Sequence, residues 1–290
     1  MLRMKFVAVI VTYHPDPKQL FKNIAAIIDD LDLLILFQNS MLDISTKERL
    51  IDTYKDKLIF HGVGKNIGIA SALNHAAKWC VDNNYDFLLS LDQDSRFIGD
   101  NLPRYKQKVT SYPSITDVGV FGVNINNRGN LLYGEEIGSI EVLETITSGS
   151  IYPVNIFRDD NYFDDDLFID AVDYEFCYRL RTQQNLKTIV FADIHLEHEV
   201  GEGLRTKWGF TTDNYSAFRT YYIIRNQLII WRKYPELFSP SYKKTYVKGH
   251  ILGRIVKILL AENKKYPKIK SIIVGFYHGL RGKKGYYNIG

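Results

Sequence analysis

Residues 87–95, FLLSLDQDS, combine a short apolar run with two aspartates separated by one residue. Comparable apolar, β-branched runs occur before and after it, and helix-period segments lie between most of them. The runs cover residues 6–12, 33–37, 58–60, 87–91 and 118–123. Such alternation predicts an α/β fold, with a mostly parallel, twisted sheet flanked by helices. Ligands of these sheets bind beyond the carboxyl ends of the strands.

The remaining chain changes character twice. The pattern predicts an irregular surface excursion over 124–143, short extended segments at 144–147, 167–169 and 188–192, and a helix from 172 to about 183. Three helical segments follow, at about 213–234, 241–261 and 268–280. None contains the roughly 18 apolar residues that a membrane-spanning helix needs. We therefore predict one domain over 1–212 and a helical C-terminal extension over 213–290.

Charge is distributed unevenly along the chain. The net formal charge is +4, but the segment from Arg232 onward contains 14 Lys and Arg residues and only two acidic residues, Glu236 and Glu262. That segment carries +12, which leaves −8 for the residues before it. A basic tail on an acidic body indicates an anionic partner, either a membrane surface or a polyanion.

The middle helical segment has an apolar face. Five residues share it, with three basic residues beside them: Val247, Ile251, Ile255, Ile258 and Leu259, flanked by Lys248, Arg254 and Lys257. Such a helix could lie in a membrane interface. The alternative is a helix that packs on the α/β domain with its basic face in water.

Two cysteines, Cys80 and Cys177, are the only ones present, and both lie in apolar, helix-like stretches. They exclude a disulfide framework and a thiolate metal site, so a cytoplasmic location is the default expectation. The amino-terminal apolar run is followed at once by Tyr13, His14 and Pro15, without a small-residue cleavage site. We interpret it as a first strand and not as a signal peptide.

The two aspartates of the 87–95 run could form a metal site. In an extended chain Asp92 and Asp94 share a face, so they could converge on one cation, or on a cation and a ribose. Carboxylate oxygens suit Mg²⁺ or Mn²⁺, which also bind substrate phosphates. The alternative is a turn in which Asp94 or Ser95 caps the next helix.

A second acidic cluster surrounds the start of the helix predicted from 172. Asp170 and Asp173 flank that start, and three further aspartates occupy 164–166. Some of them could simply cap the helix. A cleft-facing Asp173 could also act as a general base toward an acceptor hydroxyl.

Two further features lie beside predicted strand ends. The loop 62–68 contains three glycines, but its spacing departs from a dinucleotide-binding motif and it lacks a P-loop ending. It could still lie near a nucleotide or diphosphate. His195 and His198 could supply one ligand to a metal or diphosphate, although most such histidines are structural or exposed.

Seven motifs give the chain a resemblance to inverting family-2 glycosyltransferases of the GT-A fold. They are VIVTYHPD (9–16), QNS (38–40), KNIGIASALN (65–74), LLSLDQDS (88–95), TSGSIY (147–152), FIDAVDYEFCYRLR (168–181) and HEVGEG (198–203). Their order resembles most closely the bacterial rhamnosyltransferase branch that builds cell-surface polysaccharides. The resemblance covers roughly residues 5–235.

The resemblance implies a donor site at the strand ends. Thr12, Tyr13 and Gln38 would line the base pocket, and Asn66 with the helix after it would support the nucleotide. The family commonly has Asp where Gln38 stands; an amide can still accept from a pyrimidine N–H, but it has no charge.

The resemblance also implies the catalytic roles. Asp92 would face the ribose, Asp94 would hold Mg²⁺ or Mn²⁺ on the diphosphate, and Asp173 would be the base of a direct displacement at the anomeric carbon. The family's usual Glu before the base is Val172 here; Asp170 could take its place. His198 remains a candidate metal ligand.

The resulting prediction is a metal-dependent inverting glycosyltransferase of surface polysaccharide synthesis. Its donor would be a nucleotide sugar, dTDP-rhamnose first, and its acceptor a glycan or lipid-linked glycan. It would work in the cytoplasm, peripherally at the inner face of the cell membrane, where the basic tail fits. The alternatives are a UDP-hexose or UDP-galactofuranose donor, or a non-catalytic nucleotide-sugar or glycan-binding module. We expect no nucleic-acid partner, because the acidic body would oppose a polyanion.

Overall fold

The computed structural model describes residues 3–127, 129–198, 204–205 and 211–289. Contacts divide the chain into two compact units. The sheet unit comprises Met1–Phe163 and Asp173–Glu199, and the helical unit comprises Asp164–Val172 and Val200–Gly290. The acidic segment before Asp173 thus belongs to the helical unit. The division at 212/213 stays a prediction.

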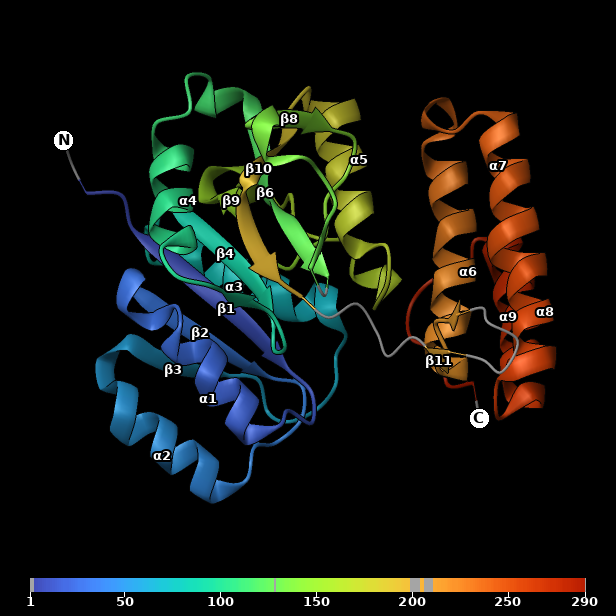
Figure 1. The fold of residues 1–290 in the computed structure, drawn as a ribbon, viewed down its shortest axis with the longest axis horizontal. Coiled ribbons are helices and arrows are strands. Elements are labelled where there is room, and N and C mark those ends of the chain that lie inside the picture. Colours follow the sequence, from blue (N-terminus) through green and yellow to red (C-terminus); the bar gives the residue numbers. More distant parts are fainter. Residues whose placement is uncertain (1–2, 128, 199–203, 206–210, 290) are drawn as a thin grey trace. The chain divides into compact units, whose positions relative to one another are not determined.

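A mixed sheet forms the centre of the sheet unit (Figure 1). Its strands are β1 (Phe6–Thr12), β2 (Leu33–Gln38), β3 (Leu58–His61), β4 (Phe87–Asp92), β5 (Arg96–Phe97), β6 (Val118–Asn127), β7 (Asn130–Leu131), β8 (Ser139–Val142), β9 (Ser150–Pro153) and β10 (Lys187–Glu197). The order is β3-β2-β1-β4-β9-β6-β10-β5, with β7 on β6 and β8 on β10. Strands β1 to β4 are parallel, and so are β6 and β10. The five predicted strands and the α/β class are confirmed.

Helices cover both faces of this sheet. They are α1 (Pro17–Ala25), α2 (Ile44–Tyr54), α3 (Ile69–Asp82), α4 (Asn101–Thr110) and α5 (Val172–Gln184). Leu20 of α1, Leu50 of α2 and Tyr105 of α4 share a buried core with Ala8 and other alternate strand residues. The intervening strand residues point to the opposite face, where α3 contacts β1, β2 and β4. Burial on both faces explains why these strands are apolar throughout.

Some predicted segments were wrong. Residues 144–147 form an open loop and not a strand, because side chains satisfy its backbone: the hydroxyls of Ser90 and Ser150 donate to the carbonyls of Thr147 and Ile146. Residues 167–169 are not extended, since a 3₁₀ turn ends there and Phe168 has a φ of 66°. The excursion 124–143 returns to the sheet, because β8 pairs with β10.

The loop between β8 and β9 carries the half-buried Glu144, and burial raises its pKa from 4.5 to about 7. Between these two pH values the folded chain keeps a proton that the unfolded chain releases, so stability falls as pH rises through this window. We expect Glu144→Gln to remove this slope and to be about 1–2 kcal/mol more stable than the parent at pH 8, after allowance for solvent screening. Urea unfolding between pH 4.5 and 8 measures this; parallel profiles for both proteins would contradict it.

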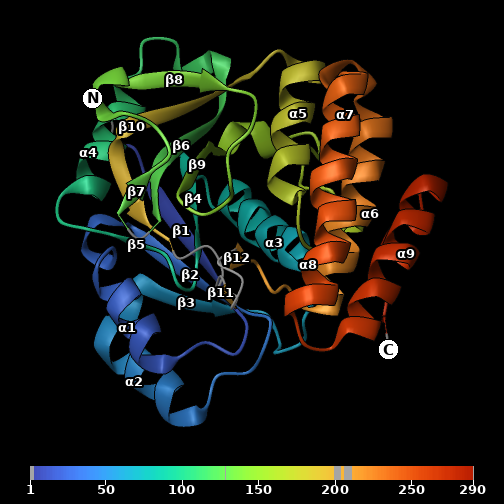
Figure 2. The ribbon, with the colours of Figure 1, turned by 45° about the vertical axis from the view of Figure 1, so that its right-hand side comes forward.

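The helical unit contains α6 (Ala217–Lys233), α7 (Pro240–Tyr246), a π-helical turn (Val247–Leu252), α8 (Gly253–Ala261) and α9 (Lys265–Arg281) (Figure 2). Helices α6 and α9 pack closely because Gly279 has no side chain: a Cβ there would lie 2.9 Å from the carbonyl oxygen of Arg225. The predicted C-terminal helical extension is confirmed. Over the described residues, no helix is long and apolar enough to cross a bilayer.

The segment Asp164–Val172 is held by two side chains of α6. Arg225 and Asn226 are fully buried. They donate to the backbone carbonyls of Asp166, Leu167, Ile169, Asp170 and Gly285. These bonds compensate an unfavourable backbone, since Phe168, Asp170 and Ala171 all have positive φ. The residues directly before Asp173 are therefore fixed from within the helical unit.

Candidate active site

The turn after β4 is fixed through its middle residue. The Gln93 side chain accepts from the Tyr13 backbone N–H at 2.8 Å and donates to the Tyr13 carbonyl at 3.2 Å. The Asn23 amide donates to the Gln93 carbonyl at 2.7 Å. With Gln93 held in this way, the carboxylates of Asp92 and Asp94 on either side keep a defined geometry. The helix-capping alternative is wrong, because β5 follows the turn and α4 begins only at Asn101.

Strand pairing brings His198 to this turn. Strand β5 pairs antiparallel with the end of β10, Glu197 opposite Arg96, so the residue that follows β10, His198, falls beside Ser95. His198 Nδ1 lies 2.7 Å from Ser95 Oγ. Ser148 Oγ donates to Ser95 Oγ at 2.6 Å and accepts from the Asp92 N–H at 3.0 Å. This chain of hydroxyls links the histidine to the aspartate turn.

The position of Ser148 depends on the glycine after it. Gly149 has a φ of +83°, and a Cβ there would lie 2.7 Å from Val123 and 2.9 Å from Leu196. Its N–H also donates to the Ser90 carbonyl of β4 at 2.8 Å. Only glycine fits this conformation and this space, which explains its place in the Thr-Ser-Gly-Ser turn.

Asp92, Asp94 and His198 lie close enough together to be candidate ligands of one cation. One ligand atom from each lies within 4.8 Å of the others. The two ring nitrogens of His198 face different carboxylates: Nε2 lies 4.0 Å from Asp92 Oδ2, and Nδ1 lies 3.7 Å from Asp94 Oδ1. The Ser95 hydroxyl can donate to Nδ1 or accept from it, according to the tautomer of His198, and only the second state leaves a lone pair on Nε2 for a cation.

The three residues predicted for the base pocket lie at the ends of β1 and β2. Thr12 and Gln38 are buried, whereas the Tyr13 side chain is about half exposed. Thr12 Oγ1 donates to the Phe37 carbonyl at 3.2 Å. Gln38 Oε1 is buried and has no hydrogen-bond partner among the described residues. A buried acceptor without a donor is costly, and a ligand N–H is one way to satisfy it.

Asn66 shapes the loop before α3. Its Oδ1 accepts from the Gly68 N–H at 3.0 Å, and the Asn39 side chain donates to the Gly68 carbonyl at 3.2 Å. The Gly64 N–H donates to the Gln38 carbonyl at 3.1 Å, so the loop is also tied to the end of β2. Asn66 is exposed, and its loop is hydrogen-bonded to Gln38 of the predicted base pocket. Its role toward a nucleotide stays a prediction.

Asp173 lies in the first turn of α5. Leu180 of the same helix packs against Gly119 at the start of β6. Strands β6 and β4 run in the same direction, because both are antiparallel to β9. Burial raises the pKa of the Tyr152 hydroxyl of β9, and the Asp173 charge adds to this rise. The role of Asp173 as a general base stays a prediction.

Two other candidates from the sequence have partners outside the group around Asp92. Asp170 is only slightly exposed in the helical unit and accepts from Arg219 Nε at 2.9 Å; burial raises its pKa, although the Arg219 charge opposes the rise. His195 lies 3.4 Å from Glu135 and is absent from the group of potential ligands around Asp92. Ser95 and Ser148, which orient the site, were not predicted; the small-residue turn at 147–150 was the available signal.

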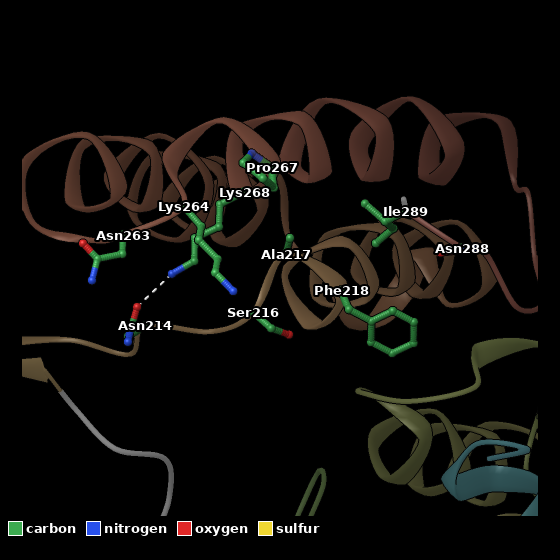
Figure 3. Close-up of a pocket in the computed structure, with 10 residues that line it drawn as sticks. All are labelled: Asn214, Ser216, Ala217, Phe218, Asn263, Lys264, Pro267, Lys268, Asn288 and Ile289. Atoms are coloured by element: carbon green, nitrogen blue, oxygen red, sulfur yellow. Dashed lines mark hydrogen bonds between the residues drawn. The ribbon is translucent and has the colours of Figure 1, made fainter. Parts of the chain in front are cut away.

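The described residues also form a cavity of about 560 Å³ within the helical unit (Figure 3). It lies between the start of α6 and the turn before α9, with Lys264, Lys268, Ser216 and Phe218 among its lining residues. Lys268 is engaged with Asn214 at 2.8 Å. None of the predicted site residues lines this cavity.

Comparisons with known proteins concern the fold and the class of enzyme. The chain is 26% identical over 298 residues to dTDP-rhamnosyl transferase RfbF of Shigella flexneri, covering 96% of each chain. Residues 1–349 of S. aureus TarS, solved with UDP-GlcNAc, have a TM-score of 0.55 at 16% identity, over 95% of this chain and 72% of that one. GalNAc-T7, solved with UDP, GalNAc and Mn²⁺, has a TM-score of 0.58 at 12% identity, over 85% and 54%.

The protein is a GT-A-like glycosyltransferase. No family model matches its sequence. The solved structures establish the fold of this glycosyltransferase, and the similarity to RfbF over nearly the whole chain supports its activity. The expected fold and the expected enzyme class are therefore confirmed. Membership of family 2 and inversion at the anomeric carbon stay predictions.

Proposed function

We propose that this glycosyltransferase moves rhamnose from dTDP-rhamnose to a glycan or lipid-linked glycan acceptor of surface polysaccharide synthesis. The supporting observation is the end-to-end similarity to RfbF, together with the cluster of Asp92, Asp94 and His198. A donor of the UDP-hexose or UDP-galactofuranose type is the alternative, and the TarS complex with UDP-GlcNAc is an example of that nucleotide on a similar fold.

The cofactor we propose is Mg²⁺ or Mn²⁺. Asp94 and His198 would hold the cation, with Asp92 at the ribose or as a further ligand, and the mixed oxygen and nitrogen donor set favours Mn²⁺ over Mg²⁺. When bound, the cation would neutralise the charge that develops on the leaving diphosphate. Ser95 would keep the His198 ring in the orientation that presents Nε2.

Asp173 is the proposed general base. The acceptor oxygen attacks the anomeric carbon while the bond from that carbon to the diphosphate breaks, and the Asp173 carboxylate takes the acceptor's proton. One displacement inverts the configuration, so a β-linked rhamnosyl donor gives an α-linked product. A carboxylate of ordinary basicity suffices, because the hydroxyl becomes acidic as its oxygen bonds to carbon.

Gln38 is the residue that we propose recognises the nucleotide base. Its buried Oε1 would accept a hydrogen bond from N3–H of thymine or uracil, which would give this oxygen the partner that it lacks. We expect Gln38→Met to raise the donor KM about tenfold and to stabilise the ligand-free protein by about 1 kcal/mol, because an apolar side chain of similar size removes an unsatisfied buried acceptor. Initial rates and urea unfolding measure the two effects. A variant that is destabilised with an unchanged KM would show that the amide has a structural role instead.

The proposed location is cytoplasmic and peripheral at the membrane. Both cysteines are buried and free, which suits a reducing compartment. A lipid-linked acceptor at the inner membrane face would suit the basic C-terminal segment.

A thermal-shift screen tests donor and metal together. dTDP-rhamnose, UDP-glucose, UDP-galactose and UDP-galactofuranose are each added with and without Mn²⁺ or Mg²⁺. A ligand at a hundred times its Kd stabilises by about 2.7 kcal/mol, so we expect an increase in Tm of several degrees with dTDP-rhamnose and metal. A larger increase in Tm with a UDP-sugar would identify that nucleotide sugar as the donor in place of dTDP-rhamnose. Equal shifts with and without metal would contradict the cation site.

A further inference from the structure

The continuous helical segment formed by the π-helical turn Val247–Leu252 and α8 is apolar on two sides. The residues that pack inward are Ile251 and Ile258, which are buried, so the membrane-facing stripe predicted from the sequence was wrong for these two. Arg254, predicted beside that stripe, is also buried, in an ion pair with Glu262. Tertiary packing therefore uses the face that the sequence suggested for a membrane.

The outward side of the same helix is apolar and has no partner within the described residues. Its four members, which we name the α8 row, are each more than half exposed: Leu252, Val256, Leu259 and Leu260. Their spacing of three and four residues places them on one helix face. Soluble surfaces usually scatter such residues singly, so a continuous row indicates an interaction surface.

Helix α9 has a similar row. Its members, the α9 row, are about half exposed or more: Tyr266, Ile273, Tyr277 and Leu280. They also follow helical spacing, and Lys270 and Arg281 lie in line with them. The polar and apolar groups needed at a lipid interface thus alternate along one helix face.

The charge around the two rows is positive and largely uncompensated. Lys248 precedes the α8 row by one turn, and Lys264 follows it. Five lysines of this region make no ion pair with the described residues: Lys244, Lys248, Lys257, Lys264 and Lys270. Exposed leucine and isoleucine beside unpaired lysine match an anionic lipid surface, where the apolar side chains enter the interface and the ammonium groups reach the phosphates.

We propose that the helical unit docks on an anionic bilayer surface through the α8 row. Bases of a nucleic acid would not need a row of half-exposed aliphatic side chains, and this favours lipid over a polyanion. The proposal is independent of which sugar is transferred.

Vesicle flotation of the full chain tests this docking. Phosphatidylcholine vesicles with about one-third phosphatidylglycerol should bind the protein, vesicles of phosphatidylcholine alone should not, and binding should weaken between 0.1 and 0.5 M NaCl. The double variant Val256→Asp/Leu260→Asp should lower the partition coefficient at least tenfold. The matched control is Ile44→Asp/Ile51→Asp on α2, which makes the same change of charge at two exposed apolar positions and should bind as the parent does.

Several results would overturn the docking proposal. They are no binding of the parent to anionic vesicles at low salt, an equal loss in both double variants, and RNA binding that is as tight as vesicle binding and insensitive to Val256→Asp/Leu260→Asp. A dimer in sedimentation velocity that this variant dissociates would assign the α8 row to a second copy of the chain. Thermal shift with dTDP-rhamnose and Mn²⁺ should be unchanged in both variants, so failure of docking and failure of the proposed transfer are distinguishable.

Discussion

Asp94→Asn is expected to lower the turnover of dTDP-rhamnose by about a thousandfold. The amide keeps the shape of the side chain but removes one of the two carboxylates in the cluster with His198. Loss of electrostatic stabilisation at a developing charge typically costs a factor of 10²–10³, and weaker metal binding adds to it. The release of dTDP measures turnover, and titration with Mn²⁺ measures the concentration needed for half-maximal rate, which should increase at least tenfold.

The matched control for this variant is Asp52→Asn. Asp52 is an exposed aspartate of α2 without an ion pair among the described residues, and its replacement makes the same change of charge. It should leave the rate within a factor of two. Turnover of Asp94→Asn near the parental rate, with an unchanged Mn²⁺ requirement, would remove Asp94 from the cation site.

Asp173→Asn is expected to lower kcat by a factor of 10²–10⁴, the usual contribution of a general base. Donor binding should persist, because the carboxylate acts on the acceptor hydroxyl. The thermal shift with donor and metal should therefore match that of the parent, whereas Asp94→Asn should lose much of it. Transfer to an acceptor glycan, followed by product chromatography, measures the first effect. A loss of donor binding equal to the loss of rate would place Asp173 on the donor side instead.

The strand framework could be predicted from the sequence because parallel strands covered on both faces are apolar throughout, and such runs are distinctive. The positions of Asp92 and Asp94 followed from it, since both come directly after a strand. His198 was harder to place. It reaches the site through β5, a strand of two residues with no periodicity of its own.

Other features could not be predicted because they depend on neighbours far away in the sequence. The missing partner of Gln38 Oε1 results from tertiary burial. On α8, both sides are apolar, and periodicity alone does not say which one packs inward; the buried pair of Arg254 with Glu262 marks that side. The role of Asp170 was also hidden, because Arg219 lies 49 residues further along the chain.

The way in which Arg225 and Asn226 hold the segment Asp164–Val172 bears on how this enzyme could be shortened or recombined. A truncated chain that stops at residue 212 would keep Asp173 and all the residues proposed to bind the nucleotide sugar. It would lack Arg225 and Asn226, whose hydrogen bonds hold the residues of positive φ before Asp173. We therefore expect the sheet unit to fold poorly without the C-terminal helices. An exchange of C-terminal helices between relatives should succeed only where residues 164–172 and the side chains of Arg225 and Asn226 come from the same protein.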